Sequence, residues 1–458
     1  MPRVFISAAH KSSGKTTLTL GLCAALHARG HQVQPFKKGP DYIDPLWLGM
    51  AAERPCYNLD FHMMTRDEIE QQFARAAASA NISLIEGNKG LYDGLDLDGS
   101  NSNAALAKLL GAPVVLVIDA RGMTRGVAPL ILGYQAFDPS IRIAGVILNN
   151  LGGSRHESKL RAVIEHYTDV EVIGAVQHDV SMQIAERHLG LVPANEQGAA
   201  RLRIQHVGER VAEQVDLARF VAIADSAPAY HPYPSRPTDV PVPSEPVRIG
   251  IAHDQAFGFY YSEDLDSLRE ANVELVDIDT LHTPDLPTLD GLIIGGGFPE
   301  MFMAELEANS SLRMQIRAAI EAGLPTYAEC GGLMYLSKSL NWQGQTRQMI
   351  GLVPGDTVMH ERPVGRGYAN LLPTGDDRWQ ESNSIPAHEF HYSSLENLPA
   401  DSIYAYKVQR GHGIDGQHDG YQLHNLLAGY VHRRGSGAHG WIGPFLKQVR
   451  AHKTLAST

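Results

Sequence analysis

A proline-rich segment in the middle of the chain constrains its fold more than any other feature. The segment from Asp225 to Pro246 contains seven prolines and has neither helical nor strand periodicity. Proline fixes φ and lacks a backbone donor, so such a run is typical of an extended, semi-rigid linker. The 458 residues are enough for two to three domains of roughly 150 residues each. We therefore predict two domains, residues 1–225 and 247–447, joined by a linker at 226–246.

Short β-branched runs alternate with amphipathic helical patterns on both sides of this linker. The predicted strands are 4–8, 83–86, 114–119, 143–148 and 170–175 before it, and 247–252, 274–278, 291–294 and 326–328 after it. Strands that alternate with helices form mostly parallel sheets covered on both faces. Past about residue 340 the short segments rich in Gly, His and Tyr predict loops and antiparallel strands. The expected fold class is α/β, with two doubly wound domains.

Charge and cysteine content exclude several classes of protein. The net charge is −12 with histidines neutral, so the long-range field repels nucleic acid phosphates and anionic membrane surfaces. We expect neither nucleic acid nor a membrane as a partner. Three cysteines in a chain of this length cannot form a disulfide framework, and the first residues lack the pattern of a secretion signal. These features predict a cytoplasmic protein.

The first predicted strand leads into a candidate phosphate-binding loop. Residues 9–17 read AHKSSGKTT and precede a helical pattern at 18–29. The pattern G-x-x-x-x-G-K-[ST] between a strand and a helix lets backbone N–H groups surround a polyphosphate. Here Ala9 replaces the first glycine, and an ordinary turn is the alternative. Lys15 is expected at the γ-phosphate and Thr16 at Mg²⁺. The candidate nucleotide-binding residues are Ser12, Ser13, Gly14, Lys15, Thr16 and Thr17.

Carboxylates follow two further elements of the first domain. Asp41 lies in the turn-rich loop KKGPDYIDP, and Glu86 ends a predicted strand. Carboxylates at the carboxyl ends of parallel strands lie beside the phosphate loop, where Mg²⁺ needs oxygen ligands. We therefore predict Asp41 and Glu86 as Mg²⁺ ligands; a turn-capping Asp and a strand-end Glu are the alternatives. Asn149, after another strand, either recognises the purine base or forms a turn.

The second domain contains a candidate nucleophile. Cys330 lies between a predicted strand and a helix and is followed by Gly331 and Gly332. A sharp strand-to-helix turn presents a nucleophile above a sheet and requires small neighbours, whereas a buried inert cysteine does not. Gly296, in a glycine run after another strand, offers an oxyanion-hole amide together with Gly331. Of 21 histidines, His432 near the end of the domain is the best candidate base.

These motifs occur together in a specific order. After the phosphate loop come GPDYIDP, IEG, the proline-rich linker, GGGFPE, AECGG, HEFHYS and a late YVH. Together they resemble the cobyrinate a,c-diamide synthase family, glutamine-dependent amidoligases with a dethiobiotin-synthetase-like ATP domain and a class I glutaminase domain. The resemblance covers essentially the whole chain. It implies a P-loop NTPase-like N-terminal domain and a class I glutamine amidotransferase-like C-terminal domain.

The resemblance implies a two-part reaction. ATP and Mg²⁺ would convert a substrate carboxylate to an acyl phosphate, and ammonia released from L-glutamine by Cys330 and His432 would displace the phosphate. Other class I glutaminases orient the histidine with a Glu two residues later, where this chain has Arg434. A Cys–His dyad is therefore implied. The substrate would be a tetrapyrrole polycarboxylate amidated on its a and c acetates, with Arg362 and Arg366 as candidate substrate contacts or solvated loop residues.

Several alternatives stay open at this point. The chain departs from the family pattern at Ala9, at Arg433–Arg434 and at Pro386–Ala387, which leaves the macrocycle undecided. Sirohydrochlorin, siroheme and nickel sirohydrochlorin are the alternative substrates. A partitioning-type P-loop ATPase that binds DNA or a membrane is the alternative from another class, but it has no use for Cys330. A homodimer is also compatible with the sequence.

Overall fold

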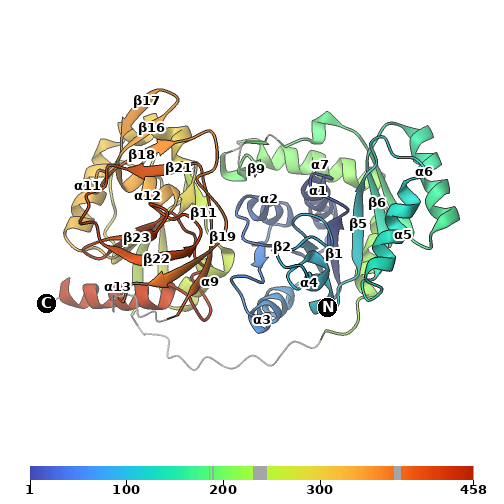
Figure 1. Cartoon of the computed structure of the whole chain (residues 1–458), viewed down its shortest axis with the longest axis horizontal. Helices are drawn as coiled ribbons and strands as arrows, with labels where there is room; N and C mark the ends of the chain where they lie inside the picture. The colour runs from blue at the N-terminus through green and yellow to red at the C-terminus, as the bar shows by residue number, and fades with distance from the viewer. Residues whose placement is uncertain (185, 188–189, 197, 231–244, 376–382, 457–458) are drawn as a thin grey trace. The chain divides into compact units, whose positions relative to one another are not determined.

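The computed structural model describes residues 1–184, 186–187, 190–196, 198–230, 245–375 and 383–456. It divides into two compact units, Met1–Pro237 and Thr238–Thr458 (Figure 1). The predicted linker at 226–246 spans the division, and most of it, 231–244, lies outside the described residues. Each unit is an α/β fold built on a sheet with parallel strands, which confirms the predicted fold class.

The first unit is a seven-stranded parallel sheet in the order β3-β2-β4-β1-β5-β6-β7. Its strands are β1 (Arg3–Ala8), β2 (Val33–Lys38), β3 (Tyr57–Leu59), β4 (Ile82–Glu86), β5 (Val114–Asp119), β6 (Ile143–Leu151) and β7 (Val172–Gln177), with a separate pair β8 (Glu186–Arg187) and β9 (Gly190–Leu191). Its helices are α1 (Lys15–Ala28), α2 (Ile43–Ala52), α3 (Arg66–Ala77), α4 (Asn103–Leu109), α5 (Val127–Phe137), α6 (Ser154–Tyr167), α7 (Ala200–Gln214) and α8 (Leu217–Asp225), and the 3₁₀ turns are η1 (Val180–Met182) and η2 (Ala194–Glu196).

Helices cover both faces of this sheet. On one face, alternate strand residues such as Phe5, Ile85 and Leu116 join a core with α3, α4, α5 and α6. On the other face, α1, α2 and α7 pack against one another (Figure 1). The strands are therefore buried on both sides, which explains why β1 and β5 are continuous apolar runs. Because β2, β4 and β1 are parallel neighbours, the loops after them begin side by side at the carboxyl edge of the sheet.

The second unit contains a nine-stranded sheet in the order β12-β10-β13-β15-β24-β23-β22-β19-β20 and a four-stranded sheet in the order β17-β16-β18-β21. Its strands are β10 (Val247–Ala252), β11 (Phe257–Phe259), β12 (Val273–Ile278), β13 (Gly291–Ile294), β14 (Gly296–Gly297), β15 (Thr326–Glu329), β16 (Ser337–Trp342), β17 (Gln345–Gln348), β18 (Val353–Met359), β19 (Gly365–Pro373), β20 (Ile385–His391), β21 (Ser393–Glu396), β22 (Tyr404–Arg410), β23 (His418–Leu423) and β24 (Leu426–Gly429). Its helices are α9 (Ser262–Glu270), η3 (Pro299–Phe302), α10 (Met303–Ala308), α11 (Ser310–Glu321), α12 (Gly331–Leu336) and α13 (Ile442–Ala456).

The nine-stranded sheet changes character along its width. The five strands from β12 to β24 are parallel, and the strands from β23 to β20 pair antiparallel. This agrees with the antiparallel strands expected past residue 340. The parallel part places the ends of β13, β15 and β24 next to one another, so the residues that follow these strands share one edge of the sheet.

The ends of the two units differ from the sequence-based boundaries. The first residues of the predicted linker pack on the first unit, where Tyr230 contacts the edge of Phe73 and Arg3 donates to the carbonyl of Pro228. In the second unit, α13 continues past residue 447, with Phe445 and Val449 buried in the core. The predicted end of the second domain, residue 447, lies inside this helix.

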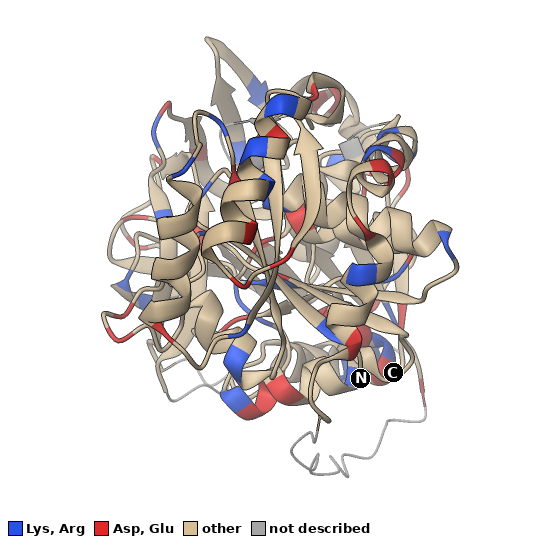
Figure 2. Ribbon diagram, turned by 90° about the vertical axis from the view of Figure 1, so that its right-hand side faces the viewer, with Lys and Arg blue, Asp and Glu red and all other residues tan. Residues whose placement is uncertain are grey.

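Charged residues and helix hydropathy give two further observations. Figure 2 shows basic and acidic positions interspersed along the ribbon in this view. Among the described residues, no helix is both long and apolar enough to cross a membrane.

Candidate functional site

The loop between β1 and α1 has the geometry of a phosphate-binding loop. Gly14 directly precedes α1 at φ 86°, and Ser12 also takes a left-handed conformation at φ 63°. A Cβ on Gly14 would lie 2.1 Å from the amide nitrogen of Asn149, so this position requires glycine for space as well as for conformation. Ala9 is not among the residues with positive φ, so its replacement of a glycine causes no backbone strain.

Asn149 anchors this loop. Its side-chain nitrogen donates to the backbone carbonyl of Ser13 at 2.9 Å. Asn149 itself is buried and lies near the carboxyl end of β6. The amide group therefore fixes the shape of the loop from β6, two strands away from β1 in the sheet. A role in recognising the purine base stays a prediction.

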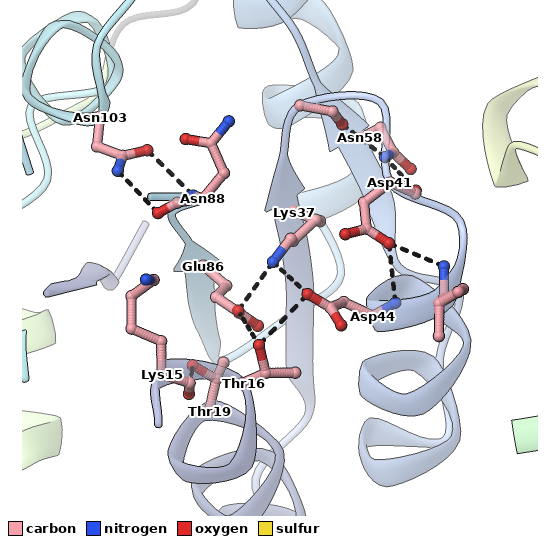
Figure 3. Close-up of polar contacts among 12 residues, drawn as sticks. Lys15, Thr16, Thr19, Lys37, Asp41, Asp44, Asn58, Glu86, Asn88 and Asn103 are labelled. Atoms are coloured by element: carbon pink, nitrogen blue, oxygen red, sulfur yellow. Dashed lines mark hydrogen bonds and ion pairs between the residues drawn. The ribbon is translucent and has the colours of Figure 1, made fainter. Parts of the chain in front are cut away.

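Four side chains converge beside the loop at the carboxyl edge of the sheet (Figure 3). The Thr16 hydroxyl donates to Glu86 Oε1 at 2.7 Å and to Asp44 Oδ2 at 3.3 Å. The Lys37 ammonium contacts the same two oxygens, at 2.5 Å from Asp44 Oδ2 and 2.8 Å from Glu86 Oε1. Glu86 is fully buried. Two carboxylates, a hydroxyl and an ammonium thus form one cluster, in which Lys37 and Glu86 are buried and Thr16 and Asp44 are partly exposed.

The aspartate in this cluster is Asp44, whereas the sequence analysis selected Asp41. The Asp41 carboxylate accepts hydrogen bonds from the backbone nitrogens of Ile43 at 2.8 Å and Asp44 at 3.1 Å, so it caps the start of α2. The role of Asp41 as a metal ligand stays a prediction. The sequence analysis missed Asp44 and Lys37 as site residues, although both lie in the same KKGPDYIDP segment.

Burial and neighbouring charges shift the pKa values of these groups in different directions. Burial raises the pKa of Glu86, and Lys37 acts against that shift. For Lys37, burial opposes the charge, but Asp44 and Glu86 outweigh it and raise the pKa well above its usual range. Burial lowers the pKa of Lys15 to about 8. Lys15 forms no ion pair within the described part of the chain, so its buried ammonium is available to an anion such as a phosphate.

The second unit places Cys330 in a strained turn between β15 and α12. The residue has φ 50° and ψ −102°, a conformation that is costly for a residue with a Cβ. A Cβ on Gly332 would lie 2.1 Å from the carbonyl of Ile294, and one on Gly331 would lie 3.0 Å from the nitrogen of Gly297. Both glycines are therefore required for close packing under the turn. Strain at a cysteine in this position is typical of a nucleophile elbow.

His432 lies against Cys330 and is buried. It follows β24 and lies near enough to Cys330 for that residue to act on its pKa. Its Nδ1 atom is 3.2 Å from Glu329 Oε2, the carboxylate next to the nucleophile. Burial lowers the pKa of His432, but Cys330 and Glu329 together outweigh this and raise it to about 10. The structure thus brings together the two residues that the sequence analysis selected and adds a third.

The third residue beside the implied Cys–His dyad is Glu329, which was not among the predicted site residues. Arg434, which occupies the position two after the histidine, instead lies 3.8 Å from the carboxylate of Glu263 through its Nε atom. The signal in the sequence was the Glu of AECGG, which sequence analysis treated only as part of the turn.

The remaining predicted residues have different surroundings. A Cβ on Gly296 would lie 2.8 Å from His432 Cε1, so this glycine leaves room for the histidine. The amide nitrogen close to Gly331 belongs to Gly297, and the oxyanion roles of Gly296 and Gly331 stay predictions. Arg362 and Arg366 are exposed in the second unit, and Arg366 lies over the Phe390 ring at 5.5 Å; their substrate role is also a prediction.

Comparison with known proteins matches each unit to a protein family. Residues 5–192 match the CobQ/CobB/MinD/ParA nucleotide binding domain, and residues 248–436 match the CobB/CobQ-like glutamine amidotransferase domain. The cobyrinate a,c-diamide synthase of Magnetococcus marinus is 48% identical over 451 residues, covering 97% of this chain and 96% of the relative. That of Methanosarcina acetivorans is 43% identical, covering 95% and 93%. This chain belongs to the cobyrinate a,c-diamide synthase family.

Membership in the cobyrinate a,c-diamide synthase family assigns the type of reaction. The protein is a carbon–nitrogen ligase that uses ATP and takes its nitrogen from glutamine. The nucleotide-binding match lies in the first unit with the phosphate loop, and the amidotransferase match lies in the second unit with Cys330. Since the relatives match over nearly the whole chain, the alternative of a partitioning-type ATPase is not supported.

Proposed function

We propose that this enzyme amidates the a and c acetate carboxylates of a cobyrinate-type tetrapyrrole through acyl phosphate intermediates. The observation that carries the proposal is the whole-chain similarity to proteins named cobyrinate a,c-diamide synthase, at 48% and 43% identity. The two half-sites described above supply the two activities that such a reaction needs. The free cysteines, all buried, are compatible with the expected reducing cytoplasm.

In the first unit, the phosphate loop would hold ATP so that a substrate carboxylate attacks the γ-phosphorus. The bond to the leaving ADP oxygen breaks as the carboxylate oxygen forms the new bond, which gives an acyl phosphate and ADP. Lys15 is expected to bind the transferred phosphoryl group, because its buried ammonium lacks an ion-pair partner among the described residues. Ammonia then attacks the acyl carbon, phosphate leaves, and the amide loses a proton.

The residues beside the loop fit a Mg²⁺ ion. Oxygens of Thr16, Asp44 and Glu86 converge, and these are the hard donors that Mg²⁺ prefers. Glu86 Oε2 is buried and has no hydrogen-bond partner among the described residues, and the Lys37 ammonium is the cation now facing the other oxygens. When bound, Mg²⁺ would neutralise charge on the phosphates of ATP. Thr16, Glu86 and Asp44 are therefore the proposed ligands.

In the second unit, the Cys330 thiolate would attack the side-chain amide of glutamine. His432 would give a proton to the departing nitrogen, so that ammonia leaves and a glutamyl thioester remains. Water activated by His432 then hydrolyses the thioester and regenerates the thiol. The raised pKa of His432 supports its role as the acid in the first step.

The substrate assignment predicts a specific product. Incubation with ATP, Mg²⁺, glutamine and cobyrinic acid should give a diamide, detected by mass spectrometry as two replacements of hydroxyl by amine. Parallel incubations contain sirohydrochlorin, siroheme or nickel sirohydrochlorin. A diamide formed only from one of these would assign that macrocycle instead, and no amidation of any of them would contradict the proposed function.

The metal assignment predicts different effects of two aspartates. Glu86→Gln and Asp44→Asn should each raise the Mg²⁺ concentration needed for amidation by about tenfold or more, since a neutral amide replaces an anionic oxygen. A Mg²⁺ titration of ATP-dependent amidation measures this, with glutamine hydrolysis as the folding control. Asp41→Asn is the matched comparison: a cap on α2 predicts a small change, whereas the sequence-based assignment of Asp41 as a ligand predicts a Mg²⁺ shift equal to that of the other two variants.

A further inference from the structure

Glu329 is a buried carboxylate that the reaction described so far does not require. It ends β15, directly before the nucleophile, and is 6% exposed. Oε1 accepts hydrogen bonds from the Tyr327 hydroxyl at 2.5 Å and from the Arg433 backbone nitrogen at 2.9 Å. Oε2 lies 3.2 Å from His432 Nδ1. Besides the histidine, two donors thus hold this carboxylate in one orientation: the Tyr327 hydroxyl on β15 and the Arg433 backbone nitrogen beyond the end of β24.

The sheet explains how adjacent residues on one strand reach the same histidine. β15 pairs parallel with β24, with Glu329 opposite Gly429, and the Cys330 nitrogen donates to the Gly429 carbonyl at 2.7 Å. His432 comes three residues after that pair. The nucleophile and the carboxylate therefore stand at the end of one strand, and the histidine stands just beyond the end of its neighbour.

Buried contacts hold both Tyr327, which donates to the Glu329 carboxylate, and His432 in place. The Tyr327 ring stacks on Trp441 with centroids 3.9 Å apart and an angle of 13° between planes. His432 is held on its other side by β20, because its backbone exchanges two hydrogen bonds with His388 and the two rings stack at 4.9 Å. Neither the carboxylate nor the imidazole can turn away without breaking a buried contact.

The position of the Glu329 carboxylate determines which ring nitrogen of His432 is available to Cys330. A carboxylate accepts but does not donate when ionised, so the Nδ1 atom facing it carries the proton. The Nε2 atom is then left for the sulfur of Cys330. In hydrolases with a Ser–His–Asp arrangement, the acid acts in this way: it fixes the tautomer and stabilises the imidazolium without accepting the proton.

We propose that Glu329 is the positioning residue of the glutaminase half-reaction. It holds the proton on Nδ1 of His432 and stabilises the imidazolium that forms with the Cys330 thiolate. The acid of this triad thus directly precedes the nucleophile in the sequence. The position two residues after the histidine is occupied by Arg434, which pairs with Glu263. The proposal rests on the assignment of Cys330 and His432 as the glutaminase pair.

The test is the isosteric variant Glu329→Gln in the full chain. We expect kcat for glutamine hydrolysis to fall roughly 10²-fold or more, with KM nearly unchanged, because the amide keeps the shape but loses the charge. Ammonium-dependent amidation should remain. Glu329→Asp, which keeps the charge but shortens the reach, should recover part of the lost rate.

A pH profile separates positioning from a structural role. The groups facing His432 are Cys330, Glu329 and, on β20, His388, whose Nδ1 lies 3.3 Å from the Tyr261 hydroxyl. Only Glu329 changes in the variant. Because Glu329 raises the pKa of His432, its loss lowers that pKa, so the imidazolium deprotonates at lower pH. The alkaline limb of glutamine hydrolysis should therefore move to lower pH.

Glu389→Gln is the matched control. Glu389 is also a buried glutamate of the second unit, and it accepts hydrogen bonds from the backbone nitrogens of His412 and Gly413. Along β20 it alternates with His388, so its side chain lies on the other face of the strand. Its variant should keep the alkaline limb of the wild type. A folded Glu329→Gln enzyme with wild-type kcat and an unshifted limb would overturn the proposal, as would equal losses in both variants.

Discussion

Replacing Cys330 with alanine is expected to abolish glutamine-dependent amidation and leave ammonium-dependent amidation intact. The thiolate forms a covalent thioester that no neighbouring group can replace, so glutamine hydrolysis should fall by roughly 10³-fold or more. The ATP site lies in the other unit and needs only ammonia from this one. Alanine keeps a Cβ, so the strained turn at φ 50° is not made worse. Amide formation is measured with glutamine and, separately, with excess ammonium chloride at mildly alkaline pH.

His432→Ala is the companion variant in the same assay. It should also lose the glutamine-dependent rate selectively, with a smaller defect because the thiol itself remains. Failure of both variants with ammonium chloride, in folded protein, would contradict the separation into two half-sites. A Cys330→Ala enzyme that keeps its glutamine-dependent rate would contradict the assignment of Cys330 as the glutaminase nucleophile. A Glu329→Gln enzyme with wild-type behaviour would contradict only the positioning role of Glu329.

Lys15→Ala is expected to abolish amidation with either nitrogen source. The buried ammonium is assigned to the transferred phosphoryl group, and phosphoryl transfer must precede attack by any nitrogen nucleophile. Loss of one such preorganised charge costs roughly 10²–10³-fold in rate. Glutamine hydrolysis in the second unit should continue. The measurement is the rate of ADP and amide formation with glutamine or ammonium chloride.

The control for Lys15 is a lysine in the same loop. Lys11 is exposed, so Lys11→Ala removes a charge of the same sign from the loop without touching the buried cluster. It should retain most of the activity. Near wild-type amidation by Lys15→Ala with ammonium chloride would show that the phosphate-loop assignment is wrong.

The parts of the site that sequence analysis identified are contiguous in the chain. The loop ending in Gly14 and Lys15 and the turn at Cys330 each depend on a few adjacent residues: a strand, glycines that permit close approach, and a helix start. Their local geometry follows from those residues whatever surrounds them. The whole-chain order of the motifs was likewise readable, and it led to the family that the comparisons show.

One central strand was missed for a local reason. β2 reads VQPFKK, with a proline and two lysines, which is not the pattern of a buried strand. Every residue of it is nevertheless buried between β3 and β4. The buried Lys37 ammonium is stabilised there by ion pairs with Asp44 and Glu86. These partners lie on α2 and β4, so β2 alone does not reveal them.

The sequence by itself thus determined the fold class, the phosphate loop, the cysteine turn and the family. Only the tertiary structure decided which carboxylates lie beside Thr16 and His432. Asp44 rather than Asp41 faces Thr16 because α2 turns it toward β4, and Glu329 reaches His432 because β15 and β24 are neighbours. Hydrogen-bond partners separated by 28 and 103 positions are brought together by strand order, and no local pattern in the chain encodes that order.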